Sequence, residues 1–348
     1  ELIFLQSMGP RLGGLLTKDI GELKRVFLSP GPIFDPEDRG EDYWGYTEAF
    51  YSVGFRPGDA VQNTFNYQLT PAGLMFEEPL RNLGCASIPA GPTDPGTQLD
   101  IMQKLRVSGY VGTASYLMHL AQKAEEKGIN LRKDLFQEVA FVTGERLSEK
   151  MRNQLEKKFD IILRQGYGTA DVGCIGYECF HKTGLHISNR CYVEICHPDT
   201  GIPLKDGEVG EIVVTSFNKT YPLIRLATGD LSYIDRAPCA CGRTSPRLGS
   251  IVGRVDTTAR IKGMFVYPHQ VEQVMARFED IKRWQIEVIN PGGIDEMILY
   301  VEASNFHQED ELLHLFRERI KLRPELKVLA PGTLPPQIKP IEDKREWD

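Results

Sequence analysis

Between Met75 and Arg164 the sequence alternates between segments with the apolar spacing of helices and short apolar runs typical of buried strands. The expected helices are 75–83, 98–106, 115–127 and 148–158, and the expected strands are 86–89, 110–112, 136–143 and 161–164. Because parallel strands need a crossover between them, this alternation predicts a mostly parallel sheet with helices on both faces. Ligands of such sheets bind at the carboxyl ends of the strands. The pattern therefore restricts the chain to the α/β class.

The flanking segments predict further structure around this sheet. At 348 residues the chain exceeds a usual single core, so we expect a large N-terminal domain and a smaller C-terminal one. The earlier segments predict a strand leading into a turn at 24–38, a helix at 41–53 and a strand at 60–64. Short apolar runs at 192–194, 210–215 and 223–226 predict a β-rich subdomain. The remainder alternates between strand and helix at 259–261, 268–277, 283–289, 297–303, 309–320 and 325–329, which predicts a small α+β lid domain.

Composition and charge narrow the classes of function. The net charge of -7 leaves no basic footprint, so nucleic acid is not an expected partner. No apolar run approaches the ~20 residues that span a bilayer, and the first ten residues lack the pattern of a signal peptide. Seven cysteines, an odd number, do not suggest a secreted disulfide framework. We expect a cytoplasmic enzyme without a membrane partner, and the sequence allows a homodimer.

The stretch from Tyr221 to Pro268 concentrates polar groups between short apolar runs. The Gly-Asp step ending at Asp230 is typical of a turn after a strand, where its carboxylate can accept hydrogen bonds from a sugar diol. Arg225 and Arg254 offer guanidinium forks that match phosphate oxygens. These groups together predict a nucleotide site. The simpler alternative for Asp230 and Arg254 is a surface ion pair of little energetic value.

A second motif, QGYGTAD, follows the strand expected at 161–164. Its glycines let the backbone pass close to a flat ring, its tyrosine can stack on adenine, its threonine leaves room for phosphate, and its aspartate can ligate magnesium. The residues are Gly166, Tyr167, Gly168, Thr169 and Asp171. The motif by itself is moderately specific, and an ordinary loop remains the alternative.

Cysteine and histidine occur in two separate clusters, YECFHKTGLH and PCACG. Thiolates and imidazole suit tetrahedral zinc, and two pairs distant in sequence can close one site. We expect a structural site, because all four ligands would come from the protein, with His181 as a substitute. The preferred ligands are Cys179, His186, Cys239 and Cys241. The alternative is a set of buried free cysteines beside a surface histidine. The remaining cysteines, Cys85, Cys174, Cys191 and Cys196, are expected in the core or in strands.

Several motifs in the same order resemble phenylacetate-coenzyme A ligases, a branch of the adenylate-forming acyl-CoA synthetases. They are NTFNYQLTPAGL, QGYGTAD, PLIRLATGDLS, CACGRTSPRLGSIVGRVD and IKGMFVYP. The resemblance starts near Arg56 and continues more loosely to the C-terminus. It implies that a small carboxylic acid, aromatic and similar to phenylacetate, reacts with ATP and Mg²⁺ to give an acyl-adenylate. Coenzyme A then displaces AMP.

The resemblance also implies roles for individual residues. Asp230 would bind the ribose hydroxyls and Arg254 the ribose or phosphate, while Gly144 and Glu145 would approach the adenine. Phe65, Tyr67 and Thr70 would lie near the acid, although aromatic residues here can equally belong to the core. Asp256 would be the hinge between domains 1–255 and 256–348, and Lys262 and Gly263 would face coenzyme A. Relatives carry more sequence before the matched region, so part of the first domain is expected to be missing.

Three departures from the family pattern bear on catalysis. The small-residue phosphate loop is reduced to Ser29 and Gly31, with Pro30 and Pro32 removing N–H donors. Nearby acids at 35, 37 and 38 add negative charge that weakens ATP binding unless magnesium intervenes. Ala170 and Asp171 stand where relatives have Ser or Thr and Glu. The catalytic lysine would be Lys339, but Ile338 replaces the preceding glycine, and another alignment puts Gln337 there.

Three hypotheses remain at this stage. The chain is an ATP-dependent acyl- or aryl-CoA ligase, or it adenylates an acid for an acceptor other than coenzyme A, or it is a catalytically altered homologue that binds nucleotide or acyl ligand. The motifs for AMP, ribose and hinge favour the first.

Overall fold

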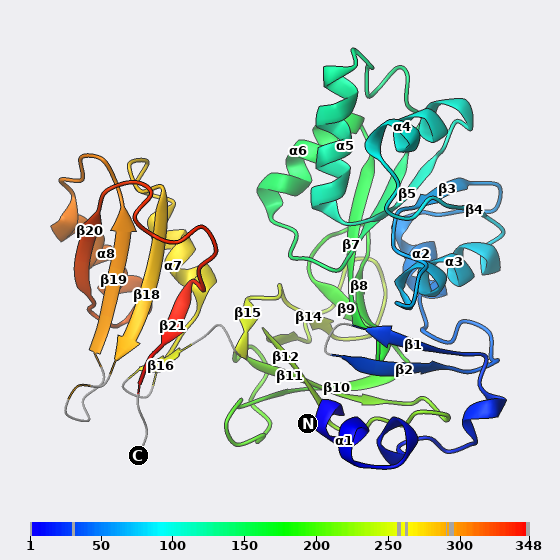
Figure 1. The fold of residues 1–348 in the computed structure, drawn as a ribbon, viewed down its shortest axis with the longest axis horizontal. Coiled ribbons are helices and arrows are strands. Elements are labelled where there is room, and N and C mark those ends of the chain that lie inside the picture. Colours follow the sequence, from blue (N-terminus) through cyan, green and yellow to red (C-terminus); the bar gives the residue numbers. More distant parts are fainter. Residues whose placement is uncertain are drawn as a thin grey trace.

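The computed structural model describes residues 2–29, 32–255, 259–261, 264–289, 291 and 296–345. Its centre is a nine-stranded sheet in the order β13-β14-β9-β8-β7-β6-β5-β3-β4 (Figure 1). The parallel part comprises β4 (Ala86–Pro89), β3 (Ala60–Asn63), β5 (Gly109–Gly112), β6 (Val139–Val142) and the start of β7 (Ile162–Thr169). This part confirms the parallel sheet predicted from the alternation.

Helices cover both faces of the parallel strands, because successive strand side chains point to opposite sides. On one face Val111 and Phe141 pack with α2 (Thr47–Val53) and α3 (Ala72–Asn82). On the other face Tyr110 and Ala140 pack with the remaining helices of this region. These are α4 (Pro95–Lys104), α5 (Ala114–Glu126) and α6 (Glu149–Phe159). The expected helix at 41–53 is shorter than predicted, beginning at Thr47.

Beyond β7 the sheet becomes antiparallel. The chain turns back at 170–172, and β7 pairs with β8 (Gly173–Glu178), so QGYGT lies mostly in a strand rather than in the expected loop. The edge continues through β9 (Leu185–Ile187), β14 (Arg247–Leu248) and β13 (Ile234–Asp235). A separate sheet of β10 (Cys191–Cys196), β11 (Gly210–Ser216), β12 (Leu226–Ser232) and β15 (Gly253–Arg254) confirms the β-rich subdomain.

The N-terminal segment forms α1 (Leu2–Met8), two short 3₁₀ turns at Arg11–Gly14 and Ile20–Glu22, and a hairpin. The hairpin pairs β1 (Arg25–Ser29) with β2 (Ile33–Glu37). Our expectation that the strand within 24–38 leads into a turn is wrong for residues 33–37, which form a second strand. Two acids of the segment, Asp35 and Glu37, lie on this strand, with Asp35 opposite Phe27 in the register.

Residues from 259 onward have a hydrophobic core of their own, built around Val271, Leu299 and Phe316. Their elements are β16 (Ala259–Ile261), β17 (Met264–Val266), α7 (Pro268–Met275), β18 (Arg283–Ile289), β19 (Glu296–Glu302), α8 (Glu309–Ile320), β20 (Glu325–Leu329) and β21 (Ile341–Asp343). The sheet order is β20-β19-β18-β21, and Figure 1 shows this part beside the larger one. An ion pair of 3.1 Å between Arg146 and Glu272 links the two parts.

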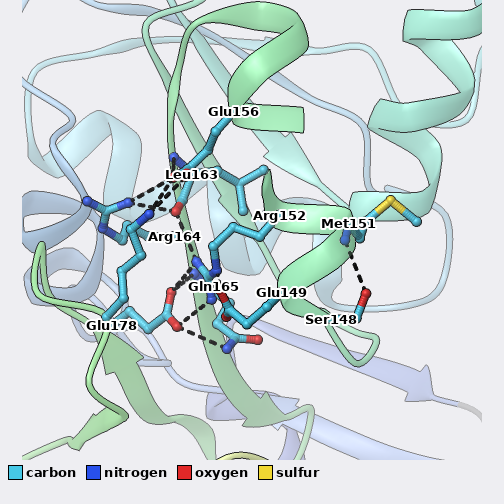
Figure 2. Close-up of polar contacts among 10 residues, drawn as sticks. Ser148, Glu149, Met151, Arg152, Glu156, Leu163, Arg164, Gln165 and Glu178 are labelled. Carbon is cyan, nitrogen blue, oxygen red and sulfur yellow. Dashed lines mark hydrogen bonds and ion pairs between the residues drawn. The ribbon is translucent and has the colours of Figure 1, made fainter. Parts of the chain in front are cut away.

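A buried ion pair holds α6 against the strands that carry the second motif (Figure 2). Arg152, on α6, donates to both carboxylate oxygens of Glu178 on β8, at 2.9 and 2.6 Å. Glu178 also accepts from the backbone N–H of Gln165 at 2.9 Å and from its side chain at 3.0 Å. Gln165 is the first residue of QGYGTAD, so this network positions β7, the strand that carries most of the motif. Within the described residues no helix is both long and apolar enough to cross a membrane.

Candidate active site

Three residues predicted for nucleotide binding meet in the β-rich subdomain. Asp230 on β12 pairs in register with Arg254 on β15, and Arg254 Nη1 donates to Asp230 Oδ1 at 2.9 Å. Tyr167 on β7 donates its hydroxyl to Asp230 Oδ2 at 2.9 Å. Burial and the neighbouring Asp230 raise the pKa of Tyr167, so it stays a donor. Asp230 retains lone pairs that can accept further hydrogen bonds, because a carboxylate has about four acceptor positions.

Gly229 makes this arrangement feasible. Its φ of +77° is unfavourable for other residues, and a Cβ there would lie 2.8 Å from Arg254 Nη2. The segment Thr228–Asp230 is part of strand β12 and not the turn expected from its Gly-Asp step. The turn prediction was wrong because the positive φ is accommodated within a strand.

Arg225 lies elsewhere. It donates to Glu194 and, at 2.7 Å, to the carbonyl of Gly201. Its guanidinium is therefore engaged with the β10 side of the subdomain, in contrast to Arg254, whose partner is Asp230. The expectation that both arginines meet one phosphate is not supported by these contacts.

A pocket of about 680 Å³ opens where β3, β4 and β5 end. Phe65 follows β3, Thr113 follows β5, and Tyr116 and His119 reach it from α5. Gly144, which follows β6, borders the same place, because a Cβ there would contact the ring of Phe65 at 3.7 Å. The location agrees with the rule that ligands bind at the carboxyl ends of parallel strands.

Glu145 binds Ser115, a residue of the pocket lining. Tyr67 and Thr70, which we predicted near the acid, are not part of that lining. Glu145 accepts from the backbone N–H of Ser115 at 2.6 Å and from its hydroxyl at 2.8 Å. The hydroxyl of Tyr67 accepts instead from Asn63 at 3.0 Å, and Thr70 donates to the carbonyl of Asn66 at 3.4 Å. Thr113, Tyr116 and His119 were not predicted from the sequence. The N-cap signal of Thr113 directly after an apolar strand could have indicated them.

The glycines of the second motif serve internal packing. A Cβ at Gly166 would collide with the ring of Phe141, and one at Gly168 would collide with the carbonyl of Gly173 and the hydroxyl of Tyr46. Thr169 accepts a hydrogen bond from the backbone N–H of Val172 at 3.2 Å, which shapes the turn before β8. These glycines therefore make room for protein atoms, a reason for their small size that differs from the one we predicted.

The reduced phosphate loop is only partly described, since Gly31 lies outside the described residues. Ser29 ends β1, is 9% exposed, and donates its hydroxyl to the carbonyl of Ile33 at 3.4 Å. The predicted hinge residue Asp256 and the predicted coenzyme A residues Lys262 and Gly263 also lie outside the described residues. Lys339 is exposed and precedes β21 in the C-terminal part.

The four preferred metal ligands come together. The ligating atoms of Cys179, His186, Cys239 and Cys241 all lie within 4.8 Å of one another. The sulfurs of Cys179 and Cys239 are 3.7 Å apart, and His186 Nε2 is 3.4 Å from the sulfur of Cys241. A tetrahedron with Zn–S bonds near 2.3 Å has edges of roughly 3.8 Å, so this spacing suits zinc. His181, our substitute ligand, is not in the cluster.

The surroundings of the cluster also suit a metal. His186 Nδ1 lies 3.2 Å from the hydroxyl of Ser245, a contact that can fix the ring with Nε2 toward the sulfurs. Burial raises the pKa of Cys179 to about 11. Burial would also raise the pKa of Cys239, but hydrogen bonds from Cys241, His186 and Thr183 prevail and lower it to about 5. These hydrogen bonds favour the thiolate form of Cys239, which is the form that binds a metal ion.

Comparison with known proteins identifies the family to which this chain is related. Residues 73–219 match the AMP-binding enzymes, and residues 263–345 match the C-terminal domain of AMP-binding enzymes. A phenylacetate-coenzyme A ligase of Thermus thermophilus is 33% identical over 93% of this chain and 79% of its own length. Its counterpart from Escherichia coli is 28% identical over 90% of this chain and 76% of its own length.

Solved structures show the same fold. A 2-hydroxyisobutyryl-CoA ligase in an open conformation, in complex with 2-HIB-AMP and CoA, superposes with a TM-score of 0.85. It is 22% identical, and the match covers 99% of this chain and 80% of that one. The TM-score falls to 0.69 for that ligase in its thioesterification state.

Proposed function

The chain belongs to the phenylacetate-coenzyme A ligase family of AMP-binding enzymes, and from this premise we propose that its substrate is a small aromatic carboxylic acid. It is an AMP-forming acid–thiol ligase, for which ATP and coenzyme A are substrates. The carboxylate first displaces pyrophosphate from ATP to form an acyl-adenylate. The thiol of coenzyme A then attacks the acyl carbon, and AMP leaves.

The convergence of Asp230, Arg254 and Tyr167 is the observation that supports our proposed nucleotide site. Asp230 accepts hydrogen bonds from the ribose hydroxyls, and Tyr167 and Arg254 hold its carboxylate in place, each at 2.9 Å. The side chain of Arg254 is about half exposed, so a ribose or a phosphate can reach its guanidinium. In this proposal Tyr167 orients Asp230 through its hydroxyl, in addition to any stacking of its ring on adenine.

We assign the acid to the pocket of about 680 Å³ beside Gly144. Its volume lies within the range of roughly 300–1,000 Å³ that is usual for small-molecule sites. Phe65 and Tyr116 provide aromatic surface, and Gly144 with Glu145 forms the border toward the proposed adenine position. An aromatic acid therefore fits this lining better than a short aliphatic one.

The remaining roles are proposals that follow from the family. The C-terminal domain, residues 256–348, rotates about Asp256, which carries Lys339 toward the α-phosphate in the first step. Lys262 and Gly263 face coenzyme A in the second step. Magnesium supplies positive charge to the phosphates, with Asp171 as a protein ligand. A cytoplasmic location and a homodimer also remain proposals.

We further propose that the four-residue cluster holds a structural zinc ion. All four coordination positions are then filled by protein, so the ion does not act on substrate. The 3.7 Å and 3.4 Å contacts within the cluster support this assignment.

Asp230→Ala is expected to weaken AMP binding about 100-fold. Two hydrogen bonds to a charged acceptor contribute roughly 1.5 kcal/mol each, which corresponds to two orders of magnitude in affinity. Isothermal titration with AMP measures the change. Asp206→Ala is the control, because Asp206 is an exposed acid whose partner is Arg236, and its replacement should leave AMP affinity unchanged. An Asp230→Ala variant that binds AMP like the wild type would reject the nucleotide site.

Pyrophosphate exchange over a panel of aromatic and aliphatic acids separates the three functions. Exchange followed by thioester formation is expected, with aromatic acids preferred. Exchange without thioester would indicate an acceptor other than coenzyme A. AMP binding without exchange would favour the altered homologue, an alternative supported by the commitment of the Ser29 hydroxyl to its own hairpin.

A further inference from the structure

Two of the three additional acids in the N-terminal hairpin region have cationic partners. Glu37 pairs with Lys24 at 2.7 Å and with Arg25 at 3.0 Å. Asp38 pairs with Lys18 at 2.8 Å and accepts a hydrogen bond from the hydroxyl of Thr220. These contacts neutralise both carboxylates. Their charge therefore does not bear directly on a bound phosphate.

Asp35 differs from its neighbours. It is 0% exposed, and neither of its carboxylate oxygens has a hydrogen-bond partner of normal geometry among the described residues. Burial and the charge of Asp171 raise its pKa to about 8, whereas contacts with Ser29 act in the opposite direction. Burying an ionised carboxylate without a compensating charge costs free energy. Asp35 is therefore stabilised by binding either a cation or a proton.

Asp171 lies in the turn between β7 and β8, and its charge and a side-chain contact with it help to raise the pKa of Asp35. One of its oxygens, Oδ1, is also buried without a hydrogen-bond partner. Burial raises the pKa of Asp171 as well. Two carboxylates from distant segments of the sequence thus interact, and among the described residues neither of them forms an ion pair with a cation.

We propose that Asp35 and Asp171 together bind a divalent cation, Mg²⁺, between the N-terminal hairpin and the QGYGTAD motif. Magnesium is typically held by one or two carboxylates together with substrate phosphates and water. The cation offsets both carboxylates and leaves coordination positions open. The phosphate part of this inference depends on the proposed function, whereas cation binding by the two aspartates does not.

The position of the pair explains how a reduced phosphate loop can still serve a nucleotide. Asp35 lies on the hairpin that carries Ser29, which starts the predicted phosphate loop, and Asp171 ends the second nucleotide motif. Relatives surround phosphate with backbone N–H groups, and Pro30 and Pro32 remove two of them here. A cation held by the hairpin's own carboxylate replaces part of that lost positive potential. Asp35 is thereby a ligand that the family resemblance did not indicate.

Manganese is a suitable probe, because free Mn²⁺ has an electron paramagnetic resonance signal that decreases on binding. In zinc-loaded, nucleotide-free wild-type protein we expect one Mn²⁺ per chain, displaceable by Mg²⁺. Asp35→Asn and Asp171→Asn should each weaken binding at least ~10-fold, since each removes one of two charged ligands. Asp38→Asn is the matched control from the same segment and should stay within about twofold of the wild type.

Two results would overturn the inference. One is a wild-type protein that binds no Mn²⁺, which would mean that the two carboxyl groups share a proton instead. The other is an Asp35→Asn variant with wild-type Mn²⁺ affinity. If Asp35→Asn does not fold, Asp171→Asn and the wild-type titration decide. AMP binding is measured separately on the same samples, so a failed cation site with intact AMP binding leaves the proposed function standing.

Discussion

Replacing Cys239 by serine is expected to release the proposed zinc ion and to lower the free energy of unfolding by about 4 kcal/mol. Zinc bound to Cys179 and Cys239 would join positions 60 residues apart in the chain. Closing a loop of that length restricts the unfolded chain much as a disulfide does, which corresponds to roughly 4 kcal/mol in the chain-entropy model. Metal content by mass spectrometry and denaturant unfolding of both proteins measure the two effects.

Two control variants test whether loss of zinc is specific to the four cluster residues. Cys85 is a buried cysteine outside the cluster, and His181 is the histidine that the cluster leaves out. Cys85→Ser and His181→Ala should both keep one zinc per chain. Wild-type protein that lacks zinc after purification with added zinc, or a Cys239→Ser variant that retains it, would contradict the proposed metal site.

Glu178→Ala is expected to destabilise the protein by about 3–5 kcal/mol, because it leaves the charge of Arg152 buried without its main partner. Arg152 is 1% exposed, and its other contacts are the Leu163 carbonyl at 3.1 Å and Glu149 at 3.0 Å. The variant also removes the acceptor for both hydrogen bonds from Gln165. Denaturant unfolding with zinc present throughout measures the loss without interference from the neighbouring Cys179.

Glu149→Ala is the matched control for the same arginine. Glu149 is 72% exposed and pairs with Arg152 from the preceding turn of α6, so its removal should cost less than about 1 kcal/mol. Equal destabilisation by the two variants would show that burial does not determine the strength of this ion pair. A stable Glu178→Ala protein would instead show that water reaches Arg152.

Much of the secondary structure was predictable because it depends on local patterns. The predicted ranges 86–89, 283–289, 309–320 and 325–329 match β4, β18, α8 and β20 residue for residue. Two turn predictions were wrong because they relied on local residue types alone. Residues 33–37 contain Pro36 and two acids and so indicate a turn, but Lys24 and Arg25 neutralise Glu37 and permit a buried strand. Gly229 likewise indicates a turn, but β12 continues through it.

In the candidate sites, too, the residue types could be predicted from the sequence, but several contacts between side chains could not. The chemistry of the metal cluster could be predicted, because thiolate and imidazole ligands are recognisable by residue type. The meeting of Asp230 with Arg254 was expected from the family motifs, whereas the role of Tyr167 as a donor to Asp230 was not. The glycines at 166 and 168 were predicted to admit a ligand, but Phe141 and Gly173 occupy the space beside them.

The amino-acid sequence alone determined the α/β class, the order of most elements and the residue types available for nucleotide and metal chemistry. Only the tertiary structure decided that Glu37 and Asp38 have cationic partners, whereas Asp35 is buried beside Asp171 and has no cationic partner among the described residues. The physical reason is that helix and strand patterns arise between near neighbours in the chain. Burial and charge compensation depend instead on residues that are distant in sequence, and these meet only when the chain has folded.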